Sequence, residues 1–148
     1  LIFVGLEIRN NTKQSQAMAF NTGVKFFRTI WGMVSTEESA EIFIKGINDF
    51  DELSLNEKAI FHSKMHEISI DFTSAVKLVN KGLLVDMDYN SFSRLYASLL
   101  LSPGVIRYLE VTQNDQPPYI VQLYKKVQND NEGTRPMSEL YKFEEIKG

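Results

Sequence analysis

The chain has 148 residues, no Cys and a formal net charge of -3 at pH 7. This length suits one domain that buries its own core, and the lack of thiols excludes disulfides, Cys-ligated zinc and Cys nucleophiles. The acidic balance argues against a nucleic-acid partner, because such binding needs a basic face for the phosphates.

The N-terminal residues 1–8 are mostly apolar and lead into the polar run 9–16. This change is typical of the end of a membrane helix, although a full span needs about 20 apolar residues. We expect 1–8 to be the end of a truncated transmembrane helix and 9–128 to be a helical domain. Residues 1–34 carry four bases and one acid, the sign expected on the cytoplasmic side. This predicts a single-pass protein of the inner (cytoplasmic) membrane with a cytoplasmic domain.

One continuous helix is predicted from the membrane exit through Val34, because the polar run contains no Pro or Gly. Apolar residues in its second half recur at the helical period. They form the stripe Phe20, Val24, Phe27, Trp31 and Val34. A lipid or ligand groove could be lined by the aromatic residues Phe20, Phe26, Phe27 and Trp31. Core packing is favoured because these positions keep bundle periodicity.

A short second helix is predicted to start at Thr36, with Ile42, Phe43 and Ile47 available for packing. Residues 48–53 are expected to form a loop. Acidic residues cluster over this region: Glu37, Glu38, Glu41, Asp49, Asp51 and Glu52. Such a cluster could receive a basic partner, but helix-start electrostatics and a solvated face explain it more simply.

The remaining elements also follow the helical period. Ser54 and Glu57 have the spacing of a capping box, and the helix that they open is predicted to stop at Gly82. Asp86 or Asp88 is expected to cap a fourth helix. Ser102-Pro103 is predicted to start a fifth, with Ser102 as the N-cap, and Pro117-Pro118 a sixth.

The C-terminal tail 129–148 has a mixed composition. Its apolar residues, from Met137 to Ile146, could make a short docked helix, although chain ends are where disorder concentrates. No strand alternation or internal repeat occurs. The predicted fold class is all-α, a bundle of about five or six helices whose long first helix continues a truncated transmembrane segment.

Four segments, in this order and spacing, carry a family resemblance: Leu6-Glu7-Ile8-Arg9-Asn10-Asn11-Thr12, Leu53-Ser54-Leu55-Asn56-Glu57, Gly82-Leu83-Leu84 and Ser102-Pro103-Gly104. The pattern resembles a family of uncharacterised bacterial single-pass membrane proteins, each with an N-terminal transmembrane helix followed by a small helical domain. The resemblance covers roughly 1–112, with Glu7 where Gln is usual and Tyr108 where Trp is usual. It implies an anchor and a helical fold, and it implies no activity and no catalytic residue.

His62 and His66 are the two histidines of the chain, and a spacing of four places both on one helix face. Such a pair can hold a metal ion, but Glu does not follow the first His as in zinc proteases, and no Glu-x-x-His pair of the di-iron type occurs. A third ligand would come from Glu67, Asp71 or Asp88. We favour an ordinary helix flank and keep the two histidines as candidate metal ligands.

No catalytic constellation and no cofactor motif stands out in the sequence. The leading hypothesis is a non-enzymatic, membrane-tethered helical domain that binds a protein partner or a second copy of itself through an exposed helical face. The alternative is a metal- or small-ligand-binding helical enzyme or sensor that uses His62 and His66.

Overall fold

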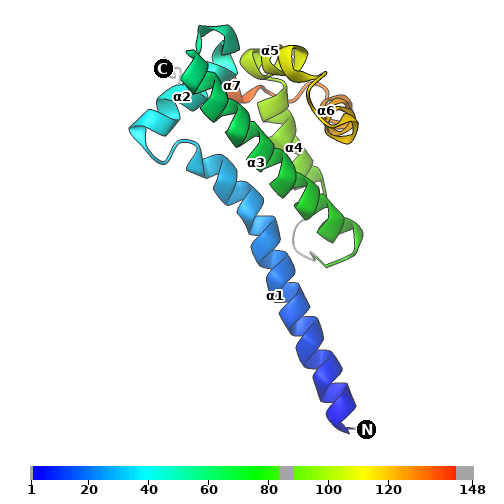
Figure 1. Ribbon diagram of the computed structural model, residues 1–148. Helices are drawn as coiled ribbons and strands as arrows, with labels where there is room; N and C mark the ends of the chain where they lie inside the picture. Colours follow the sequence, from blue (N-terminus) through cyan, green and yellow to red (C-terminus); the bar gives the residue numbers. More distant parts are fainter. Residues whose placement is uncertain (1, 84–88, 143–148) are drawn as a thin grey trace, which may run out of the picture.

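The computed structural model describes residues 2–83 and 89–142, and over these ranges the chain is all-α, without a strand (Figure 1). The prediction of a helical bundle is confirmed. The elements are α1 Ile2–Gly32, α2 Glu37–Asn48, the 3-10 helix η1 Phe50–Glu52, α3 Leu55–Asn80, α4 Tyr89–Leu100, α5 Pro103–Thr112, α6 Pro118–Asp130 and α7 Met137–Leu140.

Two predicted helix starts are confirmed by their capping hydrogen bonds. The Thr36 hydroxyl accepts from the amide of Ser39 at 3.1 Å. The Ser54 hydroxyl accepts from the amide of Glu57, whose carboxylate in turn accepts from the Ser54 amide, which is a complete capping box. These hydrogen bonds hold the pKa of Glu57 below its usual value.

Two other predictions about turns and helix starts are wrong in part. The predicted loop at 48–53 contains η1, because the Asp49 carboxylate accepts from the Asp51 amide and turns the chain. Ser102 occupies the N-cap position of α5 but makes no capping hydrogen bond. Its hydroxyl instead donates to the Ser98 carbonyl and accepts from the Ser138 amide, so it fastens α7 to the end of α4. The proposed caps Asp86 and Asp88 lie outside the described residues.

The core joins α1 to α3 on one side and α2 to α5 on the other. The α2–α5 contact is unusually close, because a Cβ placed on Gly104 would collide with the carbonyl oxygen of Gly46. Phe61 in turn lies where a Cβ of Gly46 would be. Gly104 is thus required for backbone-to-backbone packing of these helices, a role that the helix-start interpretation of Ser102-Pro103-Gly104 did not include.

The predicted core stripe of α1 is shifted by one residue from the most buried positions, although Phe27 and Val34 of the prediction are half-buried against the core. The buried positions are Ala19, Gly23, Phe26, Ile30 and Met33, whereas Phe20 and Trp31 are 51% and 56% exposed. Two hydrogen-bonding side chains help to fix this rotation, since Thr29 donates to the buried carboxylate of Asp71 at 2.6 Å and Lys25 pairs with it at 3.5 Å.

The first half of α1 projects from the rest of the molecule (Figure 1). Every side chain from 3 to 18 is exposed, and at 1.5 Å per residue this free half of α1 is about 24 Å long. The packed part of the molecule, from residue 19 onward, is called the body below. No helix in the part of the chain that the structure describes is both long and apolar enough to cross a bilayer by itself.

Candidate functional site

The histidine pair lies on α3 as predicted, with the rings perpendicular and their centroids 4.5 Å apart. Nδ1 of His62 is 2.7 Å from the Tyr108 hydroxyl, so one of its two ring nitrogens already has a partner. Burial, and then the neighbouring His66, lowers the pKa of His62. The lowered pKa favours a neutral His62, whose Nδ1, when unprotonated, can accept a hydrogen bond from Tyr108.

Two of the three candidate third ligands have other partners. Glu67 pairs with Lys64 at 3.6 Å, and Asp71 is held by Thr29 and Lys25. Asp88 lies outside the described residues. Among residues 2–83 and 89–142, no three His, Asp or Glu side chains come together in a way that could hold a metal ion. Over the described residues, a metal ion would therefore have only the imidazoles of His62 and His66 as ligands.

A buried chain of polar side chains crosses the middle of the bundle. The Ser69 hydroxyl donates to the Met65 carbonyl at 2.8 Å, and its oxygen lies 2.8 Å from the Tyr96 hydroxyl, which can donate to it, and 2.9 Å from the Tyr124 hydroxyl. Tyr124 donates to the Gln116 amide oxygen at 3.1 Å. The Gln116 amide nitrogen then donates to Thr112 at 2.6 Å. Burial raises the pKa of both Tyr96 and Tyr124. These hydroxyls are neutral hydrogen-bonding groups that align α3, α4, α5 and α6.

Several hollows, of about 170 to 580 Å³, mark the surface of the body. A cleft of about 170 Å³ between α5 and α6 reaches Gln116 and Tyr124 at the end of this polar chain. A groove of about 200 Å³ is bounded by the end of α1, by α2 and by α3. We call it the α2–α3 groove, and its apolar lining consists of Met33, Ile42, Phe43, Ile60 and Phe61, with Glu38, Ser39 and Lys64 at its polar edge.

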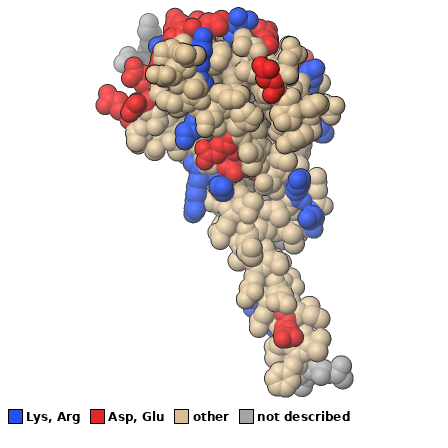
Figure 2. Space-filling model, viewed as in Figure 1, with Lys and Arg blue, Asp and Glu red and all other residues tan. Residues whose placement is uncertain are grey.

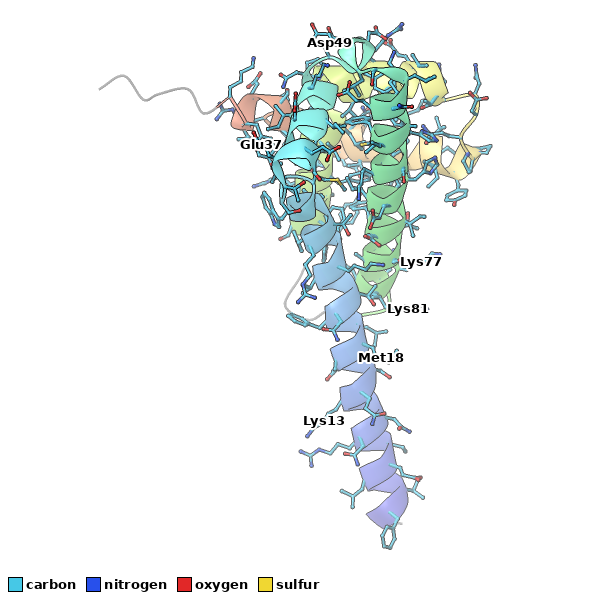
Figure 3. All side chains as sticks on the ribbon, turned by 60° about the vertical axis from the view of Figure 1, so that its left-hand side comes forward. Lys13, Met18, Glu37, Asp49, Lys77 and Lys81 are labelled. Carbon is cyan, nitrogen blue, oxygen red and sulfur yellow. The ribbon has the colours of Figure 1, made fainter. Side chains whose placement is uncertain are left out.

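The acidic cluster does not form one site. Glu37 and Glu38 lie in the first turn of α2, where the helix dipole favours them. Asp49 caps η1, and Asp51 accepts from the Arg107 guanidinium at 2.9 Å. Figures 2 and 3 place acidic side chains, including Asp49, at the end of the body far from the tip of α1. Their local roles are those expected of helix starts and surface ion pairs.

The free half of α1 is the most unusual surface of the molecule. It presents Phe3, Val4, Leu6 and Ile8 at its tip, all at least 50% exposed, with Phe3 reaching 83%. A soluble domain seldom leaves neighbouring large apolar side chains uncovered without an interaction to cover them.

Comparison with known proteins adds no further assignment. No protein-family model, no curated protein and no solved structure matches the chain. The resemblance to single-pass bacterial membrane proteins therefore stays an expectation from four short segments.

Two buried features beside these sites were missed by sequence reasoning. Tyr108 is fully buried against Phe50 and Phe61, and its position one turn after Gly104 on α5 could have indicated this. The partners of Ser69 come from α4 and α6, and no local signal pairs residues so far apart in sequence.

Proposed function

We propose that this chain is a non-enzymatic, membrane-tethered helical domain that binds another protein. The observation that carries the proposal is the free half of α1, which holds an apolar tip away from the body (Figure 1). Each large apolar side chain moved from water into lipid contributes about 1.5–3 kcal/mol. In this proposal the tip lies in the bilayer as the end of the membrane-spanning segment.

The distribution of charge supports the same orientation. Arg9 and Lys13 follow the apolar tip, at the level where lipid headgroups would lie. Lys77 and Lys81 are at the end of α3 nearest to the free half of α1, whereas Asp49 is at the opposite end of the body (Figure 3). Basic side chains next to the span favour the cytoplasmic side of the inner membrane, and acidic side chains at the far end suit a surface that faces away from anionic lipid.

The α2–α3 groove is the surface that best suits a protein partner. Its walls are apolar, its mouth is edged by Glu38 and Lys64, and Ile60 is 44% exposed at its side. A groove of this kind accepts one or two apolar anchor residues from a partner helix. Nothing in the groove has the arrangement of a nucleophile with its base, which favours recognition over catalysis.

Fractionation of cells that express the protein with a C-terminal tag tests the tether. We expect a membrane pellet that resists carbonate, with the tag protected from protease until the cells are opened. Recovery in the soluble fraction would contradict the tether, and cleavage of the tag before opening would contradict the orientation.

Photo-cross-linking in the same cells tests partner binding. A photoreactive residue in place of Ile60 is expected to give a discrete adduct with another protein. The matched control is Ile70, which lies on α3, is 60% exposed and does not line the groove. Equal labelling from both positions, or none from either, would contradict a partner site in the groove.

A further inference from the structure

Helix α1 carries two apolar stripes that lie one residue apart. The inner stripe faces the bundle and begins with Ala19, Gly23 and Phe26, all buried. Each of these is followed by an apolar or aromatic residue of a second stripe, such as Phe20, Val24 and Phe27. Since one residue turns a helix by about 100°, the second stripe faces sideways. Beside the body, Phe20 and Trp31 are exposed, whereas Val24 and Phe27 are half-buried.

Only this second stripe continues into the free half of α1. Extending it toward the N-terminus in alternating steps of four and three gives nine positions along the helix, of which seven are apolar. We call this set the outer seam, and it consists of Phe3, Leu6, Asn10, Lys13, Ala17, Phe20, Val24, Phe27 and Trp31. The inner stripe, extended in the same way, reaches Gly5, Arg9, Thr12 and Gln16 and loses its apolar character.

We propose that the outer seam is a dimer interface, in which the α1 helices of two copies of this chain form a parallel coiled coil. A seam with alternating steps of three and four is self-complementary, because two such helices can supercoil with their seams in continuous contact. The second copy is the one partner certain to carry the same repeat. The interface is isologous, as in most homodimers.

The exposure of the free half supports this occupant. Isolated helices shorter than about 12–15 residues are marginal in water even with favourable sequences, and the polar run 9–16 has neither tertiary contacts nor a strong apolar face. Pairing along the outer seam would bury Leu6 and Ala17 on either side of this run. The helix would then be stabilised along its whole length.

Asn10 indicates the arrangement of the pair. It occupies an a-type position, since Phe3 is seven residues before it and Ala17 seven after it. A single Asn at such a position favours a parallel, in-register dimer, because the two amides can then bond each other across the axis. Lys13 is the one charged residue of the seam, and its apolar stem can pack while the ammonium reaches solvent.

The body leaves part of this face accessible and half-buries Val24 and Phe27. Phe20 and Trp31 are both more than half exposed, and Phe27 stacks on Phe92 at 5.0 Å, so α4 borders the seam on one side. An exposed Trp is typical of the residues that dominate binding at interfaces. A parallel pair also places both apolar tips at the same end, as the proposed tether requires, although the dimer itself needs no membrane.

Disulfide trapping tests the inference, because the chain has no Cys of its own. Ala17→Cys puts one thiol at the seam, and Ser15→Cys puts one on the opposite side of the same helix. Under mild oxidation of the purified chain in solution we expect a covalent dimer from Ala17→Cys and at least tenfold less from Ser15→Cys. Equal yields from both variants, or no dimer from Ala17→Cys, would overturn the parallel seam.

Sedimentation provides the second readout. The chain is expected to sediment at twice its mass of 17.0 kDa, and Phe20→Lys with Trp31→Lys to sediment as a monomer with an unchanged melting temperature of the body. Met18→Lys, which changes a 71% exposed residue outside the seam, should remain a dimer. A monomeric parent chain, or a dimer that survives the double change, would contradict the proposal.

Since both measurements are made without membranes, their failure would leave the tether unaffected, and a failed fractionation would leave the dimer unaffected.

Discussion

At the scale of single residues, Gly104 decides how closely α5 approaches α2. Replacing it with Ala would force the added methyl into the carbonyl of Gly46, and backbone atoms cannot move aside as a flexible side chain can. We expect Gly104→Ala to lower the free energy of unfolding by about 1–3 kcal/mol, the usual cost of overpacking. Denaturant melts measure this loss.

Gly32→Ala is the matched control, because no atom lies within 4 Å of a Cβ at that position. Its stability should equal or slightly exceed that of the parent chain, since Ala is the better helix former. If Gly104→Ala melts like Gly32→Ala, then α2 and α5 are not packed backbone to backbone.

His62 makes stability depend on pH. Its pKa is lowered in the folded state by burial and by His66, so near its ordinary pKa of about 6.5 the unfolded chain binds more protons. Stability is therefore highest above this pH and falls as the pH drops toward the lowered pKa. Protonation would also remove the lone pair with which Nδ1 can accept from the Tyr108 hydroxyl.

Thermal melts of the parent chain and of His62→Gln at about pH 8 and about pH 5.5, on either side of that ordinary pKa, check this sign. The parent is expected to lose more stability between the two values than the variant does, after the losses common to both are subtracted. A larger loss in His62→Gln would show that protonated His62 is favoured in the fold.

Zinc provides a test of the histidine pair itself. With two imidazoles and no third His, Asp or Glu nearby in the described part of the chain, we expect equimolar zinc to leave the melting temperature unchanged. A rise that disappears in His66→Gln would revive the metal-binding alternative, because stabilisation requires preferential binding to the folded state.

At the scale of elements, capping and turn chemistry made most helix starts predictable. Thr36, Ser54 and Glu57 act through bonds to residues three positions away, which a sequence displays directly. The rotation of α1 was not predictable in this way, because its two stripes have the same spacing. The small side chains Ala19 and Gly23 mark the packed stripe, and the link from Thr29 to Asp71 spans 42 positions.

The candidate surfaces could be predicted from the sequence even less well than the rotation of α1. The α2–α3 groove combines residues of two helices with Met33, which follows α1, and the role of Ser102 depends on an amide 36 positions away. Such pairings follow from the tertiary fold and produce no periodic pattern in the sequence. By contrast, the histidine pair was visible because its two members are one helical turn apart.

The free half of α1 should behave differently from the packed half. We expect amide hydrogens of residues 9–18 to exchange rapidly at low protein concentration and to become protected at high concentration, because dimerisation would supply the missing contacts. Amides of residues 19–32 should be protected at both. Protection of 9–18 that does not change with concentration would contradict a dimer-stabilised helix.

At the scale of the whole molecule, the structure has two unlike ends. One end is the mostly apolar tip of α1, which also carries Glu7 and is followed by Arg9 and Lys13. The other end bears acidic side chains around Asp49, with basic side chains among them (Figures 2 and 3). This axial order distinguishes the molecule from an isotropic soluble bundle. The proposed tether requires that the tip, and not the body, is in contact with lipid.

A depth measurement in membranes tests this requirement most directly. Three variants carry one Cys each: Leu6→Cys, Ser15→Cys and Ser35→Cys. A fluorophore that reports polarity is attached to this Cys, in membranes of the cells that express the protein. We expect the probe at Leu6 to emit as in hydrocarbon and to be quenched from within the lipid, and the probes at Ser15 and Ser35 to be quenched by aqueous iodide. Iodide quenching as strong at Leu6 as at Ser35 would contradict the membrane tether.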